Sequence, residues 1–379
     1  MQIKPLPPLL ARANWLPLRF MGLVLALTVC ASTWAASPKS VKAPGDNASS
    51  RHADHEARRA KFQQLCANPN PSQRETLEIW AKLEGKKFGV DFCGNVEYKY
   101  FGTKEKPKTW YEIAFNDKDN VRDYSPIQYF GGIKNAGIGG QVTDLSAIAN
   151  FTELERLSVS NSKQLVDISV VANFKNLKAL SLRDTQVVSL APMADLSKLE
   201  TLELRVEPQT GMPGRKGFEA LRRLKSLKDL SMDVAEPLGD QLKDLQNLQS
   251  LVIYGPVNDV CSLGGLKQLT SLYLVKSGAR DIACLKDLKN LAVINLRGNS
   301  IKSIAELAPL PMLRNLHIED TLIEDLSALS GNPNMYLLDT DGAPLRWCSP
   351  KTAEQIKKGV SCLNADGTEK PWWKRALKQ

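Results

Sequence analysis

The 379-residue chain contains only three histidines, and the familiar catalytic motifs are missing from it. It has no phosphate-binding loop, nucleophile elbow, zinc-ligand pattern or paired-carboxylate signature. His52 and His55 have the spacing of a helical metal-ligand pair. No further ligand accompanies them, so a solvated helix face explains this pair better. We therefore expect no catalytic residue, no metal site and no cofactor.

A concentrated basic surface is also missing. Lys and Arg exceed Asp and Glu by 50 to 41, which gives a formal net charge of +9, but no compact basic stripe occurs. Such a surplus is typical of a solvated surface, and nucleic acid is not an expected partner. Hydrophobic residues make up 43% of the chain, enough for a substantial core in one repeat array or several domains.

Only the leader contains an apolar run of note, and no later stretch is long enough to cross a membrane. Three basic residues precede the uncharged stretch 20–30, and small residues follow up to Ala36. This order is typical of a secretory signal peptide, which we predict over residues 1–36. We therefore expect an exported protein, either periplasmic or secreted. Lipid attachment at Cys30 is an alternative, although Val29 stands where lipoproteins carry Gly, Ala or Ser.

The composition changes several times along the rest of the chain. Residues 37–50 are rich in Ser, Pro, Ala and Gly and predict a flexible linker. Residues 51–125 are expected to form an N-terminal cap of two short helices followed by short strands and turns. Ser72 and Glu75 have the spacing of a capping box at the start of the second helix. Residues 346–379 are expected to form a C-terminal cap with a basic aromatic tail.

Leucines recur at a fixed period from about Val142 onward. The repeat units begin at Leu154, Leu177, Leu199, Leu227, Leu248, Leu269, Leu291, Leu313 and Met335. Successive starts are 21 to 23 residues apart, except for one step of 28 residues. Repeats of this length with the spacing L-x-x-L-x-L signify a leucine-rich repeat.

The spacing within each unit predicts its local structure. The last two leucines of L-x-x-L-x-L alternate with polar residues, which favours a strand with one face inward. The period of three that follows suits extended or 3₁₀-like turns. Asn299 fills the bend position whose side chain normally hydrogen-bonds neighbouring backbone. The residues that replace Asn at this position in other units are Thr185, Thr321, Ser162 and Ser277.

We therefore predict an α/β-type solenoid over residues 126–345. It is expected to be a curved, right-handed coil with a parallel β-sheet on the concave face, a mostly irregular or 3₁₀ convex side, and a cap at each end. The segments 142–157 (VTDLSAIANFTELERL) and 301–316 (IKSIAELAPLPMLRNL) resemble the 22-residue repeats of bacterial internalin-like leucine-rich-repeat proteins. The resemblance implies an interaction protein that binds other proteins through the concave face.

Removal of the leader leaves six cysteines, and an even number in an exported protein suggests disulfides. The expected pairs are Cys66–Cys93, Cys348–Cys362 and Cys261–Cys284. The first two pairs would each staple one cap. The third pair occupies nearly the same place in adjacent coils, although adjacent coils alone do not guarantee the separation that a bridge requires.

The strand residues between the inward leucines must point outward and form two columns. One column contains Ser158, Ser181, Glu203, Ser231, Val252, Tyr273, Asn295, His317 and Asp339, and the other contains Ser160, Arg183, Arg205, Asp233, Tyr254, Val275, Arg297, Glu319 and Asp341. Exposed tyrosines with arginines nearby are typical of binding hot spots, although the β-propensity of Tyr and Val also explains them. The candidate ligand-binding residues are Arg183, Arg205, Tyr254, Tyr273, Arg297 and His317.

Charge also changes along the two columns, from arginines in the early units to carboxylates in the late ones. This order favours a protein partner of opposite polarity. The alternatives are a cell-envelope glycan that stacks on the tyrosines, or a secreted factor that acts on a host or a rival cell. An insertion within residues 206–220 predicts a loop beside the sheet. Trp372 and Trp373 in the tail are expected to pack on the cap, with contact to a membrane surface as the alternative.

Overall fold

The computed structural model describes the chain in several stretches. They are residues 48–101, 112–115, 117–119, 121–206, 216–238, 240–257, 259–329, 332, 334–335, 337–340 and 343. The chain divides into two compact units after Arg51, and the fold described below is that of the second unit. The predicted signal peptide, most of the linker, the C-terminal cap and the Cys348–Cys362 pair lie outside the described residues.

Three helices precede the sheet. They are α1 (Ala48–Ala67), α2 (Pro71–Leu83) and α3 (Val90–Phe101). The sequence predicted two helices here, and the third was missed because VDFCGNVEYKYF is rich in aromatic and β-branched residues that favour strands. None of the helices in the described residues is both long enough and apolar enough to span a membrane.

The capping box of α2 lies two residues earlier than the sequence predicted. Asn70 is the N-cap: its side chain accepts a hydrogen bond from the Gln73 backbone, and the Gln73 side chain accepts one from the Asn70 backbone. Both Asn70 and Ser72 have a suitable residue three positions on. Pro71 decides between them, because its fixed φ and missing N–H suit the first helical position.

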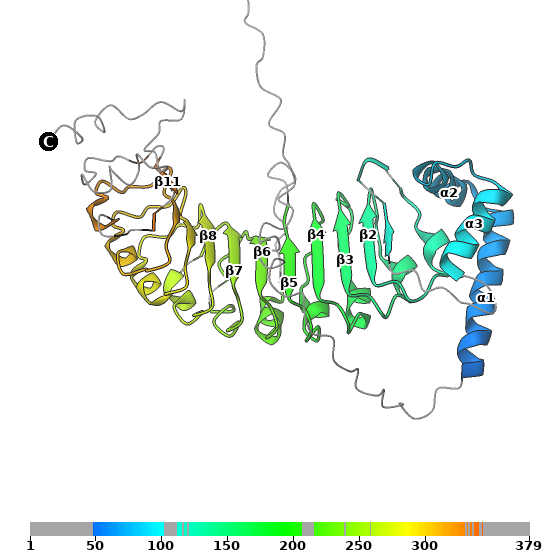
Figure 1. Ribbon diagram of the computed structural model, residues 1–379, viewed down its shortest axis with the longest axis horizontal. Coiled ribbons are helices and arrows are strands. Elements are labelled where there is room, and N and C mark those ends of the chain that lie inside the picture. The colour runs from blue at the N-terminus through cyan, green and yellow to red at the C-terminus, as the bar shows by residue number, and fades with distance from the viewer. Residues whose placement is uncertain are drawn as a thin grey trace, which may run out of the picture. The chain divides into compact units, whose positions relative to one another are not determined.

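Eleven parallel strands in the described residues form one sheet, in chain order. They are β1 (Glu112–Ala114), β2 (Asn135–Gly139), β3 (Arg156–Ser160), β4 (Ala179–Arg183), β5 (Thr201–Leu204), β6 (Asp229–Asp233), β7 (Ser250–Tyr254), β8 (Ser271–Val275), β9 (Val293–Asn295), β10 (Asn315–His317) and β11 (Leu337–Asp339). Figure 1 shows neighbouring strands side by side in this order. The α/β-type solenoid is confirmed, and its first strand lies ahead of the predicted range 126–345.

The inward residues of the strands form one continuous core. Leu157 of β3 is registered with Leu180 of β4, and the same column continues through Leu202 of β5. All three side chains are buried, and the hydrophobic cluster runs without interruption from Phe62 in α1 to Leu338 in β11. Each coil therefore buries its leucines against its neighbours, as the repeat period predicted.

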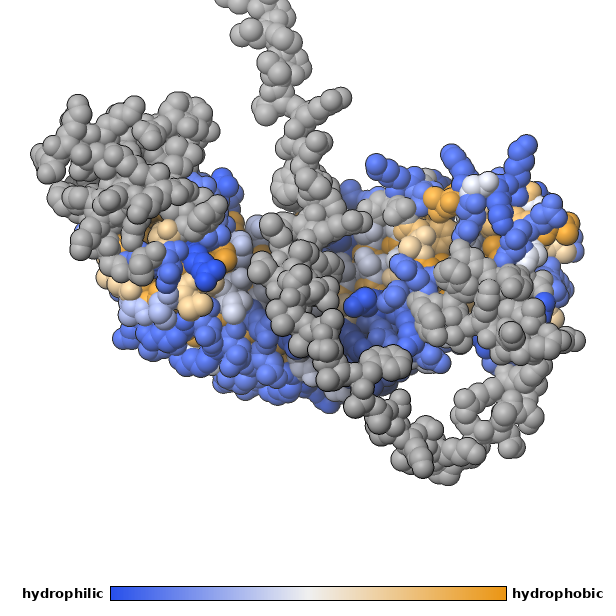
Figure 2. Space-filling view, in the orientation of Figure 1, coloured by the Kyte–Doolittle hydropathy of each residue, from blue (hydrophilic) through white to orange (hydrophobic). Residues whose placement is uncertain are grey.

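Short 3₁₀ helices recur on the other side of the coils. They are η1 (Asp117–Asp119), η2 (Ser125–Ile127), η3 (Ser146–Ile148), η4 (Ser169–Asn173), η5 (Ala191–Met193), η7 (Phe218–Arg223), η8 (Val260–Leu263), η9 (Ala283–Asp287), η10 (Ala305–Leu307) and η11 (Ser327–Leu329). Many follow an Asp that accepts a hydrogen bond from the backbone two residues on, as Asp281 does from Ala283 at 2.8 Å. The surface over these turns is almost entirely hydrophilic (Figure 2).

The chain leaves several strands through one residue in the left-handed conformation. The residues at this position are Asn161, Asp184, Lys276, Gly298 and Asp320, with φ between 52° and 71°. L-residues adopt this conformation at a cost, and Gly, Asn and Asp tolerate it best. The turn redirects the chain from the sheet toward the 3₁₀ side.

Asn299 stabilises one of these turns in the way the sequence predicted. Its Oδ1 accepts hydrogen bonds from the backbone N–H groups of Ser277 and Ala279, both at 3.0 Å. Its Nδ2 donates to the carbonyl oxygens of Leu274 at 2.6 Å and Leu296 at 2.7 Å. A single buried amide thus ties two successive coils together.

The N-terminal helices cover the first coils through an aromatic cluster. The Trp80 ring of α2 meets the rings of Phe92, Phe115 and Phe130 edge-on, with centroids 6.0, 5.8 and 5.7 Å away. Phe62 of α1 lies 5.2 Å from Phe130. These contacts close the apolar end of the array, which would otherwise expose leucines and a sheet edge.

Two of the three predicted disulfides are present in the structure. Cys66 and Cys93 join α1 to α3, with a Cα–Cα distance of 6.2 Å. Cys261 of η8 and Cys284 of η9 join adjacent coils, with a Cα–Cα distance of 5.1 Å. Both separations lie in the range that a disulfide requires. The coil-to-coil pair forms because the repeat brings equivalent positions of neighbouring turns together.

Candidate ligand-binding face of the sheet

The register of the strands produces the two columns that the sequence predicted, except for Asp341, which lies outside the described residues. Asp233, Val275 and Glu319 of the second column are buried, so that column is less exposed than predicted. Val252 is paired with Tyr273, Asp233 with Tyr254, and Tyr254 with Val275. Because the strands are parallel and in register, side chains at equivalent positions lie next to one another about 4.8 Å apart. A ligand on this face would therefore meet side chains from several coils at once.

Arg205, Tyr254 and Tyr273 make up a feature that we call the arginine–tyrosine platform. The Arg205 guanidinium carbon lies 3.8 Å from the centroid of the Tyr254 ring, a close cation–π contact. The Arg205 Nε donates to Asp233 Oδ2 at 3.0 Å. The Asp233 residue is only 4% exposed, and its carboxylate also accepts from the Val206 backbone at 2.7 Å. Arg205 is thus held between a buried anion and an aromatic ring.

Tyr273 extends the platform into the next coil. It lies in β8, and its neighbour in the ladder is Val252 of β7. Burial raises the pKa of the Tyr273 phenol, with a smaller contribution from nearby Tyr254. Both tyrosines are half-buried, so part of each side chain is exposed to solvent. The middle of the sheet face is therefore partly apolar, with polar atoms at its surface.

The early arginines are paired within the protein. Arg183 Nη2 lies 2.8 Å from Glu203 Oε1, and Ser181 Oγ donates to the other Glu203 oxygen at 2.8 Å. Arg205 is paired with Asp233 in the same way. The face around β4 to β6 consequently presents ion pairs, which weakens the expectation of a positively charged region that attracts an acidic partner.

Arg297 lies apart from the platform. Its Nε is 3.5 Å from Asp320 Oδ2, and about half of each side chain is exposed. An exposed pair of this kind contributes little to stability. Arg297 therefore remains a candidate contact residue for a ligand, but the structure does not bring it together with the tyrosines.

His317 belongs to a different cluster from the tyrosines. Its Nδ1 lies 3.9 Å from Glu319 Oε1, and Asp339 is its ladder neighbour in β11. Burial raises the pKa of Glu319 to about 7, and the Asp339 carboxylate adds to this shift. Burial lowers the pKa of His317, whereas Asp339 raises it. The late coils therefore carry a closely spaced group of one imidazole and two carboxyls.

Two groups on this face were not singled out as site residues from the sequence. Asp233 holds Arg205 in the platform. The sequence feature that could have identified it is a carboxylate in the second column, one repeat unit after an arginine. The second group is Glu319 with Asp339, which the repeat register placed beside His317 in the two columns. Their burial, which gives the cluster its character, follows from the packing of the last coils and has no sequence signature.

Two shallow grooves lie on the other side of the coils. They have volumes of about 420 and 360 Å³ and are lined by residues of the 3₁₀ turns, including Asp281 and Glu306 in one and Asp144 and Asp167 in the other. The sheet face, by contrast, offers an extended surface. That geometry suits a macromolecule better than a small molecule, which prefers a concave and mostly apolar pocket.

The fold is similar to that of an internalin (inlF) from Listeria monocytogenes, with a TM-score of 0.52 and 21% identity over 66% of this chain and 78% of that chain. An internalin C2 from the same organism has a TM-score of 0.34 and 20% identity over 72% and 93% of the two chains. The plant peptide hormone receptor RGFR1, in complex with RGF2, has a TM-score of 0.45 and 19% identity over 62% and 41%.

No protein-family model and no curated protein sequence matches the chain. The internalin inlF comparison and the order of the strands together show a leucine-rich-repeat fold. The likeness to internalins that the repeat segments indicated is thus confirmed at the level of the fold.

Proposed function

We propose that this protein is an exported interaction protein that binds a protein partner on the exposed face of its sheet. The observation that carries the proposal is the arginine–tyrosine platform. Arg205 is held in place by buried Asp233 and by the Tyr254 ring before any ligand arrives. Side chains that are already ordered lose little conformational freedom on binding, and Arg and Tyr are the types that dominate hot spots.

The platform favours a protein partner over a glycan. A sugar would stack on an open aromatic face, but the Arg205 guanidinium already lies 3.8 Å over the Tyr254 ring. The remaining surface combines a cation with two phenol groups. Such a surface can donate hydrogen bonds to main-chain carbonyls and side-chain carboxylates, and it can also contact apolar groups.

Two features support export. The composition of residues 1–36 is that of a secretory signal peptide. The Cys66–Cys93 and Cys261–Cys284 bridges are of the kind that persists in an oxidising compartment. We accordingly place the protein in the periplasm or outside the cell, where its partner would be a component of the envelope or the medium.

The proposal can be tested by affinity capture with the oxidised chain from envelope and medium fractions. The Tyr254→Ala/Tyr273→Ala variant should retain its thermal midpoint within a few degrees, because both rings are only half-buried. It should lose the partner that the unchanged protein captures, since truncation of a hot-spot residue typically costs about 2 kcal/mol or more.

A matched control is available on the turn side of the coils. Met312 and Leu322 are 43% and 46% exposed, so Met312→Ala/Leu322→Ala removes a comparable amount of exposed apolar surface away from the sheet. This variant should capture the partner normally. A partner that both variants retain would contradict the assignment of the site. If the chain captures envelope polysaccharide and no protein, the ligand is a glycan and the proposed protein partner is wrong.

A further inference from the structure

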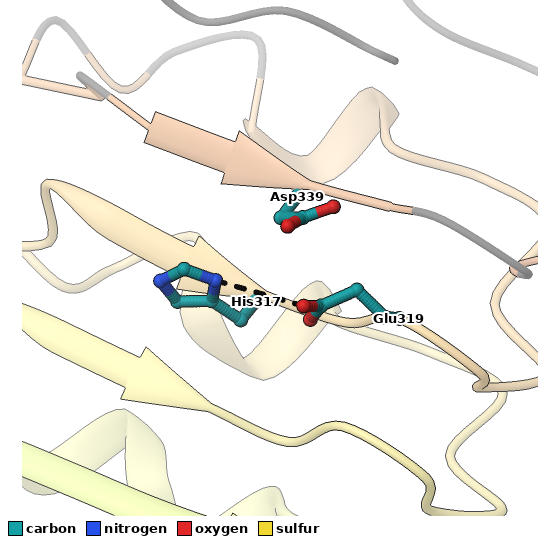
Figure 3. Close-up of side chains that lie close together, drawn as sticks. All are labelled: His317, Glu319 and Asp339. Carbon is teal, nitrogen blue, oxygen red and sulfur yellow. Dashed lines mark ion pairs between the residues drawn. The ribbon is translucent and has the colours of Figure 1, made fainter. Parts of the chain in front are cut away.

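Three potential metal ligands converge on the sheet face at the late end of the described array. His317 ends β10, and Glu319 follows two residues later, in the turn that leaves the strand. Asp339 is registered directly opposite His317 in the neighbouring strand. Figure 3 shows the Glu319 carboxyl group directed at the His317 imidazole, with Asp339 on the adjacent strand beside them. One ligand atom from each residue lies within 4.8 Å of the other two.

Glu319 provides a second and independent observation. The residue is only 9% exposed, and its Oε2 is buried without a hydrogen-bond partner among the described residues. Its other oxygen faces the His317 ring at 3.9 Å. A buried carboxylate oxygen that accepts no hydrogen bond is costly, and a bound cation would offset that cost.

In the described residues, no Lys or Arg side chain forms an ion pair with the Glu319 carboxylate. Arg297 is a nearby cation, but its Nε lies 3.5 Å from Asp320 instead. His317 lies two residues before Glu319 in the chain and opposite Asp339 in the neighbouring strand. Glu319 therefore lies beside an imidazole and a second carboxyl group, and no Lys or Arg in the described residues forms an ion pair with Glu319.

We propose that His317, Glu319 and Asp339 bind a divalent transition-metal ion of the zinc class. Imidazole nitrogen with carboxylate oxygen is a ligand set that Zn²⁺ accepts, whereas Mg²⁺ and Ca²⁺ prefer oxygen ligands alone. Ligand atoms of a tetrahedral zinc lie about 3.4 Å apart for bonds of about 2.1 Å. Side-chain rotations that move the ligand atoms by about 1 Å bring the three donors to that spacing.

Three protein ligands leave one coordination position open toward the exposed face. A water molecule or a carboxylate, imidazole or thiolate of a bound partner would occupy it. The two adjacent strands fix two of the ligands on rigid backbone, which limits the ordering cost of the site. The site is separate from the arginine–tyrosine platform in β5 to β8, so neither assignment depends on the other.

The test is titration of the purified, oxidised chain with Zn²⁺ by calorimetry in a buffer that does not chelate metal. Co²⁺ is then used as a spectroscopic probe, because the intensity of its visible d–d absorption distinguishes a tetrahedral protein site from the octahedral aqueous ion. We expect one Zn²⁺ site that weakens by more than about 10-fold in His317→Gln and in Glu319→Gln, since loss of outer-shell partners alone costs 10- to 100-fold. Zn²⁺ should also raise the thermal midpoint of the unchanged protein and not that of Glu319→Gln.

The other two histidines of the chain provide the matched control. His52→Gln/His55→Gln removes the remaining imidazoles and should leave the Zn²⁺ affinity and the Co²⁺ spectrum unchanged. Asp339→Asn, at a half-buried position, tests the site again if Glu319→Gln folds poorly. The proposal is overturned if the unchanged chain binds no Zn²⁺, if binding survives in His317→Gln and Asp339→Asn, or if the control variant loses it.

Discussion

At the scale of single residues, two threonines occupy the same bend position of different coils but differ in their hydrogen bonds. Thr321 Oγ1 donates to the Ile318 carbonyl at 2.7 Å. Thr185 Oγ1 is buried and has no hydrogen-bond partner among the described residues. A buried hydroxyl that lacks a partner has lost its hydration without compensation, whereas a bonded one contributes to stability.

We therefore expect opposite effects from the same substitution at these two sites. Thr185→Val should raise the free energy of unfolding by about 1 kcal/mol, because it removes an uncompensated polar group and keeps the side-chain shape. Thr321→Val should lower it by about 1 kcal/mol. Urea denaturation with unchanged m-values measures both. Equal destabilisation by the two substitutions would show that the Thr185 hydroxyl is satisfied in solution.

At the scale of the coil, the Cys261–Cys284 disulfide joins two successive 3₁₀ helices. It closes a loop with a sequence separation of 23 residues. In the chain-entropy account, a bridge of this span stabilises the folded protein by about 3 kcal/mol, through its constraint on the unfolded chain. The same two coils are already held together by the β7–β8 ladder and by the core, so the bridge adds to contacts that exist without it.

Replacement of both cysteines should accordingly lower the free energy of unfolding by about 3 kcal/mol without changing the fold. Cys261→Ser, Cys284→Ser and the double variant are compared by denaturant unfolding under oxidising conditions. The double variant should be no less stable than either single one, because each single change already removes the bond. Additive losses would mean that the two cysteines act independently and are not bonded.

The coil is also the scale at which the sequence was most informative. A period of 21 to 23 residues fixes which residues stack, so the inward leucines and the outward columns could be predicted from spacing alone. The role of Asn299 followed from its position in the unit. A second row was not singled out: Asn247 and Asn290 each precede a unit-start leucine and donate to a carbonyl of the preceding coil, at 2.9 and 2.8 Å.

Features outside the repeat were harder to predict. The start of α2 depended on a choice between two equally good capping patterns, and α3 has a composition that favours strands. The ion pairs of Arg183 and Arg205 and the burial of Glu319 depend on side-chain conformations between coils. The repeat spacing predicts the column in which a residue lies, but it does not predict which residue its side chain forms an ion pair or hydrogen bond with.

At the scale of the whole array, each coil contacts only its neighbours, so damage at one end should remain local. Trp80 lies at the centre of the aromatic cluster that covers the first coils, and it is only 4% exposed. Trp80→Ala should lower the free energy of unfolding by about 3–5 kcal/mol, as truncation of a buried aromatic side chain typically does. Amide hydrogen exchange should rise most in β1 and β2.

Phe174, which is fully buried and follows η4 in the segment that links β3 to β4, provides the matched comparison. Phe174→Ala should move the centre of increased exchange to those two strands and leave the helices of the cap protected. Mass spectrometry of the exchanged peptides locates each centre. A uniform rise in exchange along all strands in both variants would indicate that the array unfolds as one cooperative block.

The order of the strands has a consequence for how the chain acquires its structure. Every strand pairs with the strands immediately before and after it in the sequence, and no strand in the described residues pairs with one farther along the chain. A chain delivered from its N-terminus, at the ribosome or through an export channel, therefore always has the partner of its newest coil already in place. The three helices emerge before the strands, and their apolar side can serve as the template to which the first coils add.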